Sequence, residues 1–283
     1  MGVRDGQQDE RQTGEWLFTL PAFYAEFAPL PQHSSVVDHV YVLKDCGMLT
    51  ADRQVFASPF RELSFTYRRS DHVHKVIMVQ PSFGHRKRNQ AFHGWSFGVR
   101  SKPSVHWSSG TDGPPFADCQ SRLAQAVLSG PSCIDVLSIL DQLVNGLTKQ
   151  SADRSGEVYH FLDVSQFQVA RLATLLGQSV RTLQRRLKTS TGLPPKRFLA
   201  VERFRRAVQA VPMRNAKLSV VAGDLGFSDQ AHLTREFQRH AGLSPGAFQQ
   251  CRGIRGQVVR FVQDSGSPTR LRVAVLWVAL LMA

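Results

Sequence analysis

Residues 222–248 read AGDLGFSDQAHLTREFQRHAGLSPGAF, and residues 173–198 read ATLLGQSVRTLQRRLKTSTGLPPKRF. Both stretches open with Ala-x-x-Leu-Gly-x-Ser, continue with an apolar-x-Arg-x-apolar step and close with Gly-Leu-x-Pro-x-x-Phe. The opening repeats at an offset of 49 residues and the remainder at 50, so the second copy carries one extra residue after its serine. Self-similarity of this kind indicates a duplicated supersecondary unit.

Each copy predicts a helix, a tight turn and a second helix. In the first copy, Gly177 ends one helix in a left-handed turn, and Ser179 caps the N-terminus of the next. Apolar spacing places Leu183 and Leu187 on the inner face of that second helix. In the second copy the same roles fall to Gly226 in the turn, Ser228 as the cap, Leu233 and Phe237 inside, and Gly242 at the end. Each copy is therefore predicted to be a helix-turn-helix, whose second helix can enter a DNA major groove.

A single long helix is predicted between the copies, over residues 195–211. Its apolar face carries Phe198, Val201, Phe204, Val208 and Val211, whereas Arg203, Arg205 and Arg206 lie elsewhere on its surface. If this helix is rigid, the two recognition helices can sit in successive major grooves about 34 Å apart. The first helix of the first unit has two candidate locations, residues 157–164 and residues 134–147.

With these residues the chain resembles, over residues 160–250, the C-terminal DNA-binding domain of AraC/XylS-type transcription regulators. Arginine suits the edge of guanine and glutamine suits adenine, whereas phosphate contacts position a protein without specifying sequence. The resemblance implies base contacts from Arg181, Gln184, Arg185, Gln230, His232 and Arg235. It leaves phosphate contacts to Thr182, Arg186, Lys188 and Thr234. The alternative for each basic residue is a solvated helix face.

The positive charge of the chain is confined to the repeated region. The chain has 35 basic and 22 acidic residues, of which residues 160–260 hold 17 and five. Residues 1–159 hold 16 of each sign and carry no net charge. A generally basic protein would spread its charge evenly, so this distribution favours a polyanionic partner at the repeats.

The remainder of the chain predicts an α+β protein. Short β-branched and aromatic runs at residues 36–43, 62–68, 75–80 and 95–100 predict strands, and two helices are expected at residues 119–128 and 133–147 after a Ser/Gly/Pro-rich breaker at 103–115. The expected fold is a β-rich N-terminal sensor-like domain with flanking helices, followed by an all-α domain of two helix-turn-helix units and a linker helix. The expected boundaries are a disordered tail at 1–15, a regulatory and dimerisation domain at 16–150, the DNA-binding domain at 155–252 and a C-terminal tail at 253–283.

Double-stranded DNA is the expected partner. The N-terminal part loosely resembles the sensing domains of the same family, so we also expect a small-molecule effector and a homodimer. RNA polymerase is a further expected partner. The four scattered cysteines and the lack of a signal segment favour reduced thiols in the cytoplasm. No cofactor or metal is expected, because the histidines of the β-rich region have no cysteine or acidic partner at the spacing of metal ligands. The basic run His85–Arg88 is interpreted as a solvated loop.

Three other functions compete with transcription regulation. A DNA-repair alkyltransferase would need a reactive cysteine in a Pro-Cys-His-Arg-like context, which the sequence lacks. A β-barrel enzyme with an appended DNA-binding module would need a catalytic group that no motif identifies, so we expect no enzyme. A sequence-blind architectural DNA binder is the third. The apolar run at residues 273–283 is too short to span a bilayer and can pack on the protein, form an interface or reflect an atypical gene end.

Overall fold

The structure is a computed structural model that describes the chain in twelve segments. They are residues 15–19, 23–46, 52–68, 74–89, 93–102, 114–148, 158, 161–162, 167–211, 217–250, 258–263 and 271–275. Of the disordered tail expected at residues 1–15, residues 1–14 lie outside these segments, whereas Glu15 begins a helix. The end of the apolar run, residues 276–283, also lies outside them.

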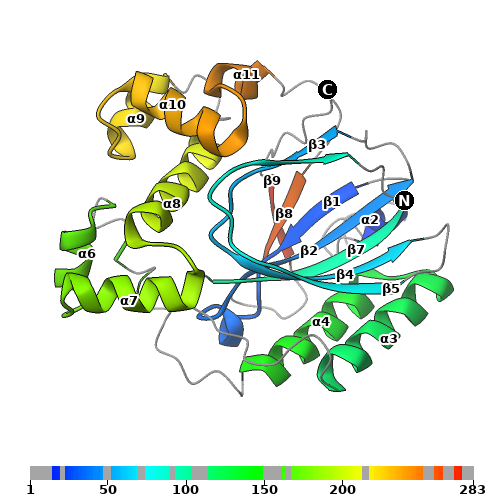
Figure 1. The fold of residues 1–283 in the computed structure, drawn as a ribbon. Helices are drawn as coiled ribbons and strands as arrows, with labels where there is room; N and C mark the ends of the chain where they lie inside the picture. The colour runs from blue at the N-terminus through cyan, green and yellow to red at the C-terminus, as the bar shows by residue number, and fades with distance from the viewer. Residues whose placement is uncertain are drawn as a thin grey trace, which may run out of the picture.

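The N-terminal part is built around a seven-stranded sheet of order β5-β4-β7-β2-β1-β8-β9 (Figure 1). Its strands are β1 (Phe23–Phe27), β2 (Val37–Cys46), β4 (Arg61–Arg68), β5 (His74–Val79), β7 (His93–Ser101), β8 (Val258–Gln263) and β9 (Leu271–Val275). A separate two-stranded sheet pairs β3 (Asp52–Val55) with β6 (Arg86–Asn89). The helices of this part are α2 (Glu15–Thr19), η1 (Pro31–His33), α3 (Pro114–Ser129) and α4 (Cys133–Thr148). The expected strands and helices are therefore present, and the α+β class is confirmed.

One face of the large sheet forms the main hydrophobic core. Because side chains alternate along a strand, Leu63, Phe65 and Tyr67 of β4 all point to this face. They pack with Phe97 of β7 and with the buried sides of α3 and α4, which cover the face. Leu140 of α4 is fully buried there. The helices thus supply the second layer that an amphipathic sheet requires.

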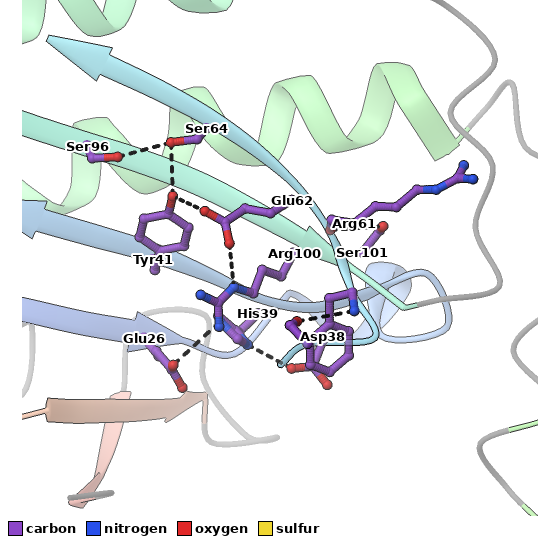
Figure 2. A network of polar contacts seen from close by, with 12 residues as sticks. Glu26, Asp38, His39, Tyr41, Arg61, Glu62, Ser64, Ser96, Arg100 and Ser101 are labelled. Atoms are coloured by element: carbon purple, nitrogen blue, oxygen red, sulfur yellow. Dashed lines mark hydrogen bonds and ion pairs between the residues drawn. The ribbon is translucent and has the colours of Figure 1, made fainter. Parts of the chain in front are cut away.

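The opposite face of the sheet carries a buried polar network (Figure 2). The Tyr41 hydroxyl donates to Glu62 Oε1 at 2.5 Å and lies 3.0 Å from Ser64 Oγ. Arg100 Nε donates to Glu62 Oε2 at 2.8 Å. Gly98 lies between Tyr41 and Ser64 on adjacent strands, and a Cβ there would stand 2.1 Å from the Tyr41 ring. The missing side chain therefore makes room for the ring that organises the network.

The protonation states within this network are complementary. Burial alone would raise the pKa of Glu62, but the charge of Arg100 and the hydrogen bond from Tyr41 outweigh it and hold that pKa below its ordinary value. Burial, reinforced by the Glu62 carboxylate, raises the pKa of the Tyr41 hydroxyl. A neutral phenol and a guanidinium thus both donate to one carboxylate. Such pairing offsets the cost of burying these charges.

The C-terminal part is all helical within residues 167–250 as far as the structure describes them. Its helices are α6 (Val169–Leu175), α7 (Val180–Thr191), α8 (Pro195–Ala210), α9 (Leu218–Asp224), α10 (Gln230–Ala241) and α11 (Pro245–Gln250). Figure 1 shows α8 running from the α6–α7 pair to the α9–α10 pair, beside the sheet. Two separate hydrophobic clusters form, one around α6 and α7 and one around α9 and α10. The duplicated unit predicted from the sequence is therefore observed as two small cores joined by one helix.

Two loops of the N-terminal part complete the second of these cores. Ala57 is buried among the side chains of α8 and α10, and its N–H donates to the carbonyl oxygen of His240 at 3.0 Å. The ring of Phe56 lies 6.0 Å from that of Phe204 and 5.9 Å from that of Phe248. Phe83 packs edge-on against the His240 ring at 4.8 Å. The two parts of the chain are consequently in direct apolar contact.

Three sequence-based expectations are corrected by the fold. Of the run His85–Arg88, expected in a solvated loop, residues 86–88 belong to β6, because pairing with residues 53–55 satisfies their backbone groups. Helix α3 begins at Pro114, inside the expected breaker, since proline is well suited to the first turn of a helix. Residues 258–263, expected in a C-terminal tail, form β8, which pairs parallel to β1.

Of the two candidate locations for the first helix of the first unit, residues 157–164 are described only at 158, 161 and 162. Val158 and Leu162 are buried in the cluster around α6 and α7. Residues 134–147 lie within α4 and pack on the sheet instead. Val158 and Leu162 therefore supply additional apolar contacts of the first unit, and residues 134–147 do not.

Candidate nucleic-acid interface

The first recognition helix, α7, has the caps and the inner face that its sequence predicts. Ser179 Oγ accepts the Thr182 N–H at 3.1 Å, which satisfies one of the free donors of the first turn. Leu183 and Leu187 are buried against the first core. Gly192 ends the helix at φ 73°, a left-handed conformation that glycine adopts without strain. The opposite side of α7 is thereby left facing outward.

The second recognition helix, α10, differs from the prediction at its cap. Asp229, and not Ser228, is the N-cap residue, and its Oδ1 accepts the His232 N–H at 2.6 Å. This hydrogen bond is the main reason that the pKa of Asp229 lies below its ordinary value. Asp229 is the extra residue of the second copy, so the insertion shifts the cap by one position. Leu233 and Phe237 are fully buried, as expected.

The outward side of α7 carries most of its predicted contact residues. Arg181, Thr182, Gln184, Arg185 and Lys188 are exposed, and Arg186 is half-buried. Lys188 Nζ donates to the Gly192 carbonyl oxygen at 3.0 Å, so this ammonium also caps the C-terminus of the helix. Exposed guanidinium and amide groups on one helix face can form paired hydrogen bonds with base edges.

The outward side of α10 presents a similar arrangement with one constraint. Gln230, Ala231 and Arg235 are exposed, whereas His232 and Thr234 are half-buried. Thr234 Oγ1 donates to the Gln230 carbonyl oxygen at 2.9 Å. The Ser228 N–H donates to His232 Nδ1 at 3.3 Å, and the imidazole stands edge-on to the Phe227 ring at 5.3 Å. His232 therefore helps to build the turn through Nδ1, which leaves Nε2 as the ring nitrogen available to an external partner.

A groove of about 780 Å³ lies between the two helix-turn-helix units. Gln184 of α7 and His232 of α10 both line it, together with Lys196 and Arg203 of α8. Two predicted contact residues from different copies thus share one concave surface. The other residues assigned to base or phosphate contacts lie outside the groove lining.

The arginines of α8 have roles that the sequence did not reveal. Arg205 Nε pairs at 3.0 Å with the carboxylate of Glu202, which is fully buried, and its guanidinium lies 5.4 Å from the Phe60 ring. The guanidinium of Arg206 lies 5.2 Å from the Phe167 ring. On the basis of net charge alone, these arginines were assigned to a polyanion-binding surface. Their contacts show that they also pack within the protein.

Comparison with known proteins places this geometry in a family. Residues 172–250 match the family model described as a helix-turn-helix domain. The chain is 34% identical over 93 residues to the HTH-type transcriptional activator RhaS of Escherichia coli O157:H7, and 36% identical over 83 residues to the HTH-type transcriptional regulator RipA of Corynebacterium glutamicum. Residues 172–250 form an AraC/XylS-type helix-turn-helix domain.

The matches to RhaS and RipA are confined to about a third of this chain or less. The aligned region is 33% of this chain and 33% of RhaS, so the chain spans about a third of the length of that relative. Among solved structures, the DNA-binding domain of AdpA in complex with a target DNA is 31% identical, covers 33% of this chain and 87% of that chain, and has a TM-score of 0.31. ToxT from Vibrio cholerae covers 75% of this chain and 96% of its own at 10% identity, with a TM-score of 0.42. These scores are low, so the assignment rests on the sequence matches.

The described residues provide no evidence for two other kinds of site. Within those segments, no group of three or more His, Cys, Asp or Glu side chains is arranged to hold a metal ion. None of the helices described is long and apolar enough to cross a bilayer.

Proposed function

We propose that the protein is a sequence-specific DNA-binding transcription regulator that inserts α7 and α10 into successive major grooves of one duplex. The observation that carries the proposal is the pair of recognition helices, each capped, each buried on its inner side, and each presenting an exposed arginine at the matched position, Arg185 and Arg235. The two helices belong to one AraC-type domain and are joined by one continuous helix, α8.

The side chains divide into two groups by chemistry and exposure. Base-edge contacts are assigned to Arg181, Gln184, Arg185, Gln230, His232 and Arg235, and phosphate contacts to Thr182, Arg186, Lys188 and Thr234. Arg185 and Arg235 are exposed, and neither has an ion-pair partner among the described residues. A guanidinium without such a partner can donate two parallel hydrogen bonds to guanine O6 and N7. His232 has one ring nitrogen left for this purpose, because Ser228 occupies the other.

Selection of preferred duplexes from a random pool with the full chain tests the proposal directly. We expect two short conserved blocks whose centres are one helical turn apart, because α7 and α10 read one block each. Affinity for the selected duplex should fall steeply with salt, since phosphate contacts release counterions. Recovery of a single block, or of no preference over random duplex at fixed salt, would contradict the proposal.

Alanine substitutions at the repeated arginines test which residues read sequence. Arg185→Ala and Arg235→Ala should each weaken binding to the selected duplex by about 1–3 kcal/mol and relax preference at one base pair. The matched control is Arg239→Ala, on the same helix as Arg235 but in its last turn, where it forms an ion pair with Glu236. The control should leave the base preference unchanged. Equal effects of Arg235→Ala and Arg239→Ala in an anisotropy titration would remove Arg235 from the base-reading group.

Further parts of the proposal concern the whole protein. They comprise a regulator without catalytic activity, located in the cytoplasm, with a small-molecule effector, a homodimer and RNA polymerase as partners. They rest on the family to which the AraC-type domain belongs. Sedimentation analysis of the purified chain, with and without operator duplex, measures the oligomeric state; a monomer under both conditions would exclude the homodimer.

A further inference from the structure

The helix α8 belongs to both helix-turn-helix units at once. Phe198 and Leu199, near its N-terminus, are buried in the first core, and Phe204 and Ala207, further along, are buried in the second. The relative orientation of α7 and α10 therefore depends on how firmly each unit is attached to α8. Arg203 lies on α8 where the two cores meet.

The guanidinium of Arg203 touches an aromatic ring from each unit. Its Cζ lies 5.5 Å from the Phe167 ring and 5.2 Å from the Phe227 ring. Phe167 is a member of the first core and Phe227 of the second. Arg203 Nη1 also donates to the Gly226 carbonyl oxygen at 3.1 Å, in the turn between α9 and α10. One planar group thus contacts the start of the first unit and the turn of the second.

The backbone at Phe167, one of the two rings that Arg203 contacts, has an unusual conformation. Phe167 has φ 58° and is the one non-glycine residue with a positive φ among those described. Residues held in the left-handed region carry strain and persist only where surrounding contacts favour them. The guanidinium groups of Arg203 and Arg206, which both lie over the Phe167 ring, supply such contacts.

The two copies of the repeat differ where the second unit meets Arg203. At the offset of 49 residues, Phe227 of the second copy corresponds to Gln178 of the first. An aromatic ring is therefore present at this turn position only in the second unit, which is also the unit whose turn contacts Arg203. Phe227 thus both packs in the second core and contacts the Arg203 guanidinium, and the described part of the first unit has no counterpart of this contact.

We propose that Arg203 is a positioning residue that fixes the register between the two helix-turn-helix units, so that both recognition helices engage one duplex together. The inference rests on the proposed DNA-binding function and names a residue that sets the spacing of the site. Two linked binding modules gain affinity only when their geometry lets both engage at once. Loosening the junction therefore weakens binding to a two-block duplex and leaves binding to either block alone unchanged.

The test compares Arg203→Met in the full chain on three duplexes: the selected two-block operator, a duplex with one block randomised, and the operator with one base pair added to the spacer. Each added base pair rotates the second block by about 35°. We expect Arg203→Met to lose about tenfold or more on the operator, to stay within about twofold of the wild type on the single block, and to discriminate less against the longer spacer.

Lys196→Met is the matched control. Lys196 is exposed on α8, lines the same groove and carries the same charge, so its removal tests simple electrostatics. This variant should weaken all three duplexes alike and lower the slope of log affinity against log salt by about 1, with the spacer preference intact. Arg203→Lys serves if the methionine variant fails to fold, because it keeps the charge and the alkyl chain but loses the planar stack. The Arg203→Lys variant should discriminate less against the longer spacer than the wild type does, while the slope of its log affinity against log salt stays unchanged.

The outcomes are distinguishable. If the Arg203 variants weaken the single-block and two-block duplexes equally, Arg203 is a phosphate contact or a general structural residue, and the proposal is overturned. If the wild-type chain itself binds both duplexes equally well, the two-groove function fails first, independently of Arg203. Relaxed spacing with unchanged single-block affinity supports the assignment.

Discussion

Truncating Phe56 should destabilise the second helix-turn-helix unit, although the residue lies in the N-terminal part of the chain. The Phe56 ring packs against Phe204 and Phe248, which belong to the core around α10. Removal of a fully buried phenylalanine side chain costs about 3–5 kcal/mol. Phe56 is half-buried, so we expect Phe56→Ala to cost roughly 2 kcal/mol, against a typical total of about 5–15 kcal/mol.

The location of the effect distinguishes this prediction from a general loss of stability. Native-state hydrogen exchange should show protection in α8, α10 and α11 falling by about 30-fold, the equivalent of 2 kcal/mol. The melting temperature should drop by about 4–8 °C. Val220→Ala on α9 is the control, because Val220 is 55% exposed and its truncation should change the unfolding free energy by less than about 0.5 kcal/mol.

Two results would refute the reasoning. One is a change below about 0.5 kcal/mol for Phe56→Ala, which would mean that the contact seen between the two parts contributes nothing to stability. The other is loss of protection confined to β3 and β4, the strands that flank Phe56, because the effect would then be local to the N-terminal part.

Three further predictions concern the caps, one histidine and one glycine. Ser179→Ala should cost about 1 kcal/mol of unfolding free energy in urea titrations, and Ser228→Ala less than half of that, because an aspartate caps the second helix; equal costs would contradict the assignment. Burial lowers the pKa of His240 despite its bond to a backbone carbonyl, so the unfolded chain binds more protons near pH 6. The contribution of neutral His240 to the unfolding free energy should therefore be complete above about pH 6.5. Below that pH it should decline by at most about 1.4 kcal/mol per pH unit, and His240→Gln should remove this pH dependence. Gly98→Ala should cost about 1–3 kcal/mol, because its Cβ would overlap the Tyr41 ring; an unchanged melting temperature would show that the ring moves without penalty.

The sequence was sufficient to predict the local architecture of the C-terminal domain. Apolar residues at helical spacing placed Leu183 and Phe237 inside, and glycine at Gly192 and Gly242 marked the left-handed ends of the recognition helices; all four lie as expected. These features depend on contacts within a few residues, so the local pattern contains the information. The four predicted strands are likewise present as β2, β4, β5 and β7.

The cap of α10 shows where a local pattern misleads. Ser228 matches Ser179 in the alignment of the copies, yet the inserted Asp229 takes the capping position. Either residue type caps a helix well, and the choice depends on where the first helical turn begins. That starting point is set by how Leu233 and Phe237 fit the second core, which no local pattern reports.

Residues far apart in the chain decided the remainder. Three contacts join segments separated by long stretches of sequence. They are the pairing of β6 with β3, the insertion of Phe56 and Ala57 into the core around α10, and the contacts of Arg203 with two aromatic rings. A 3.6-residue period records which side of a helix is buried, but it does not record what covers that side. Local sequence patterns therefore establish that there are two helix-turn-helix units, whereas long-range packing establishes how these units are held relative to each other and to the sheet.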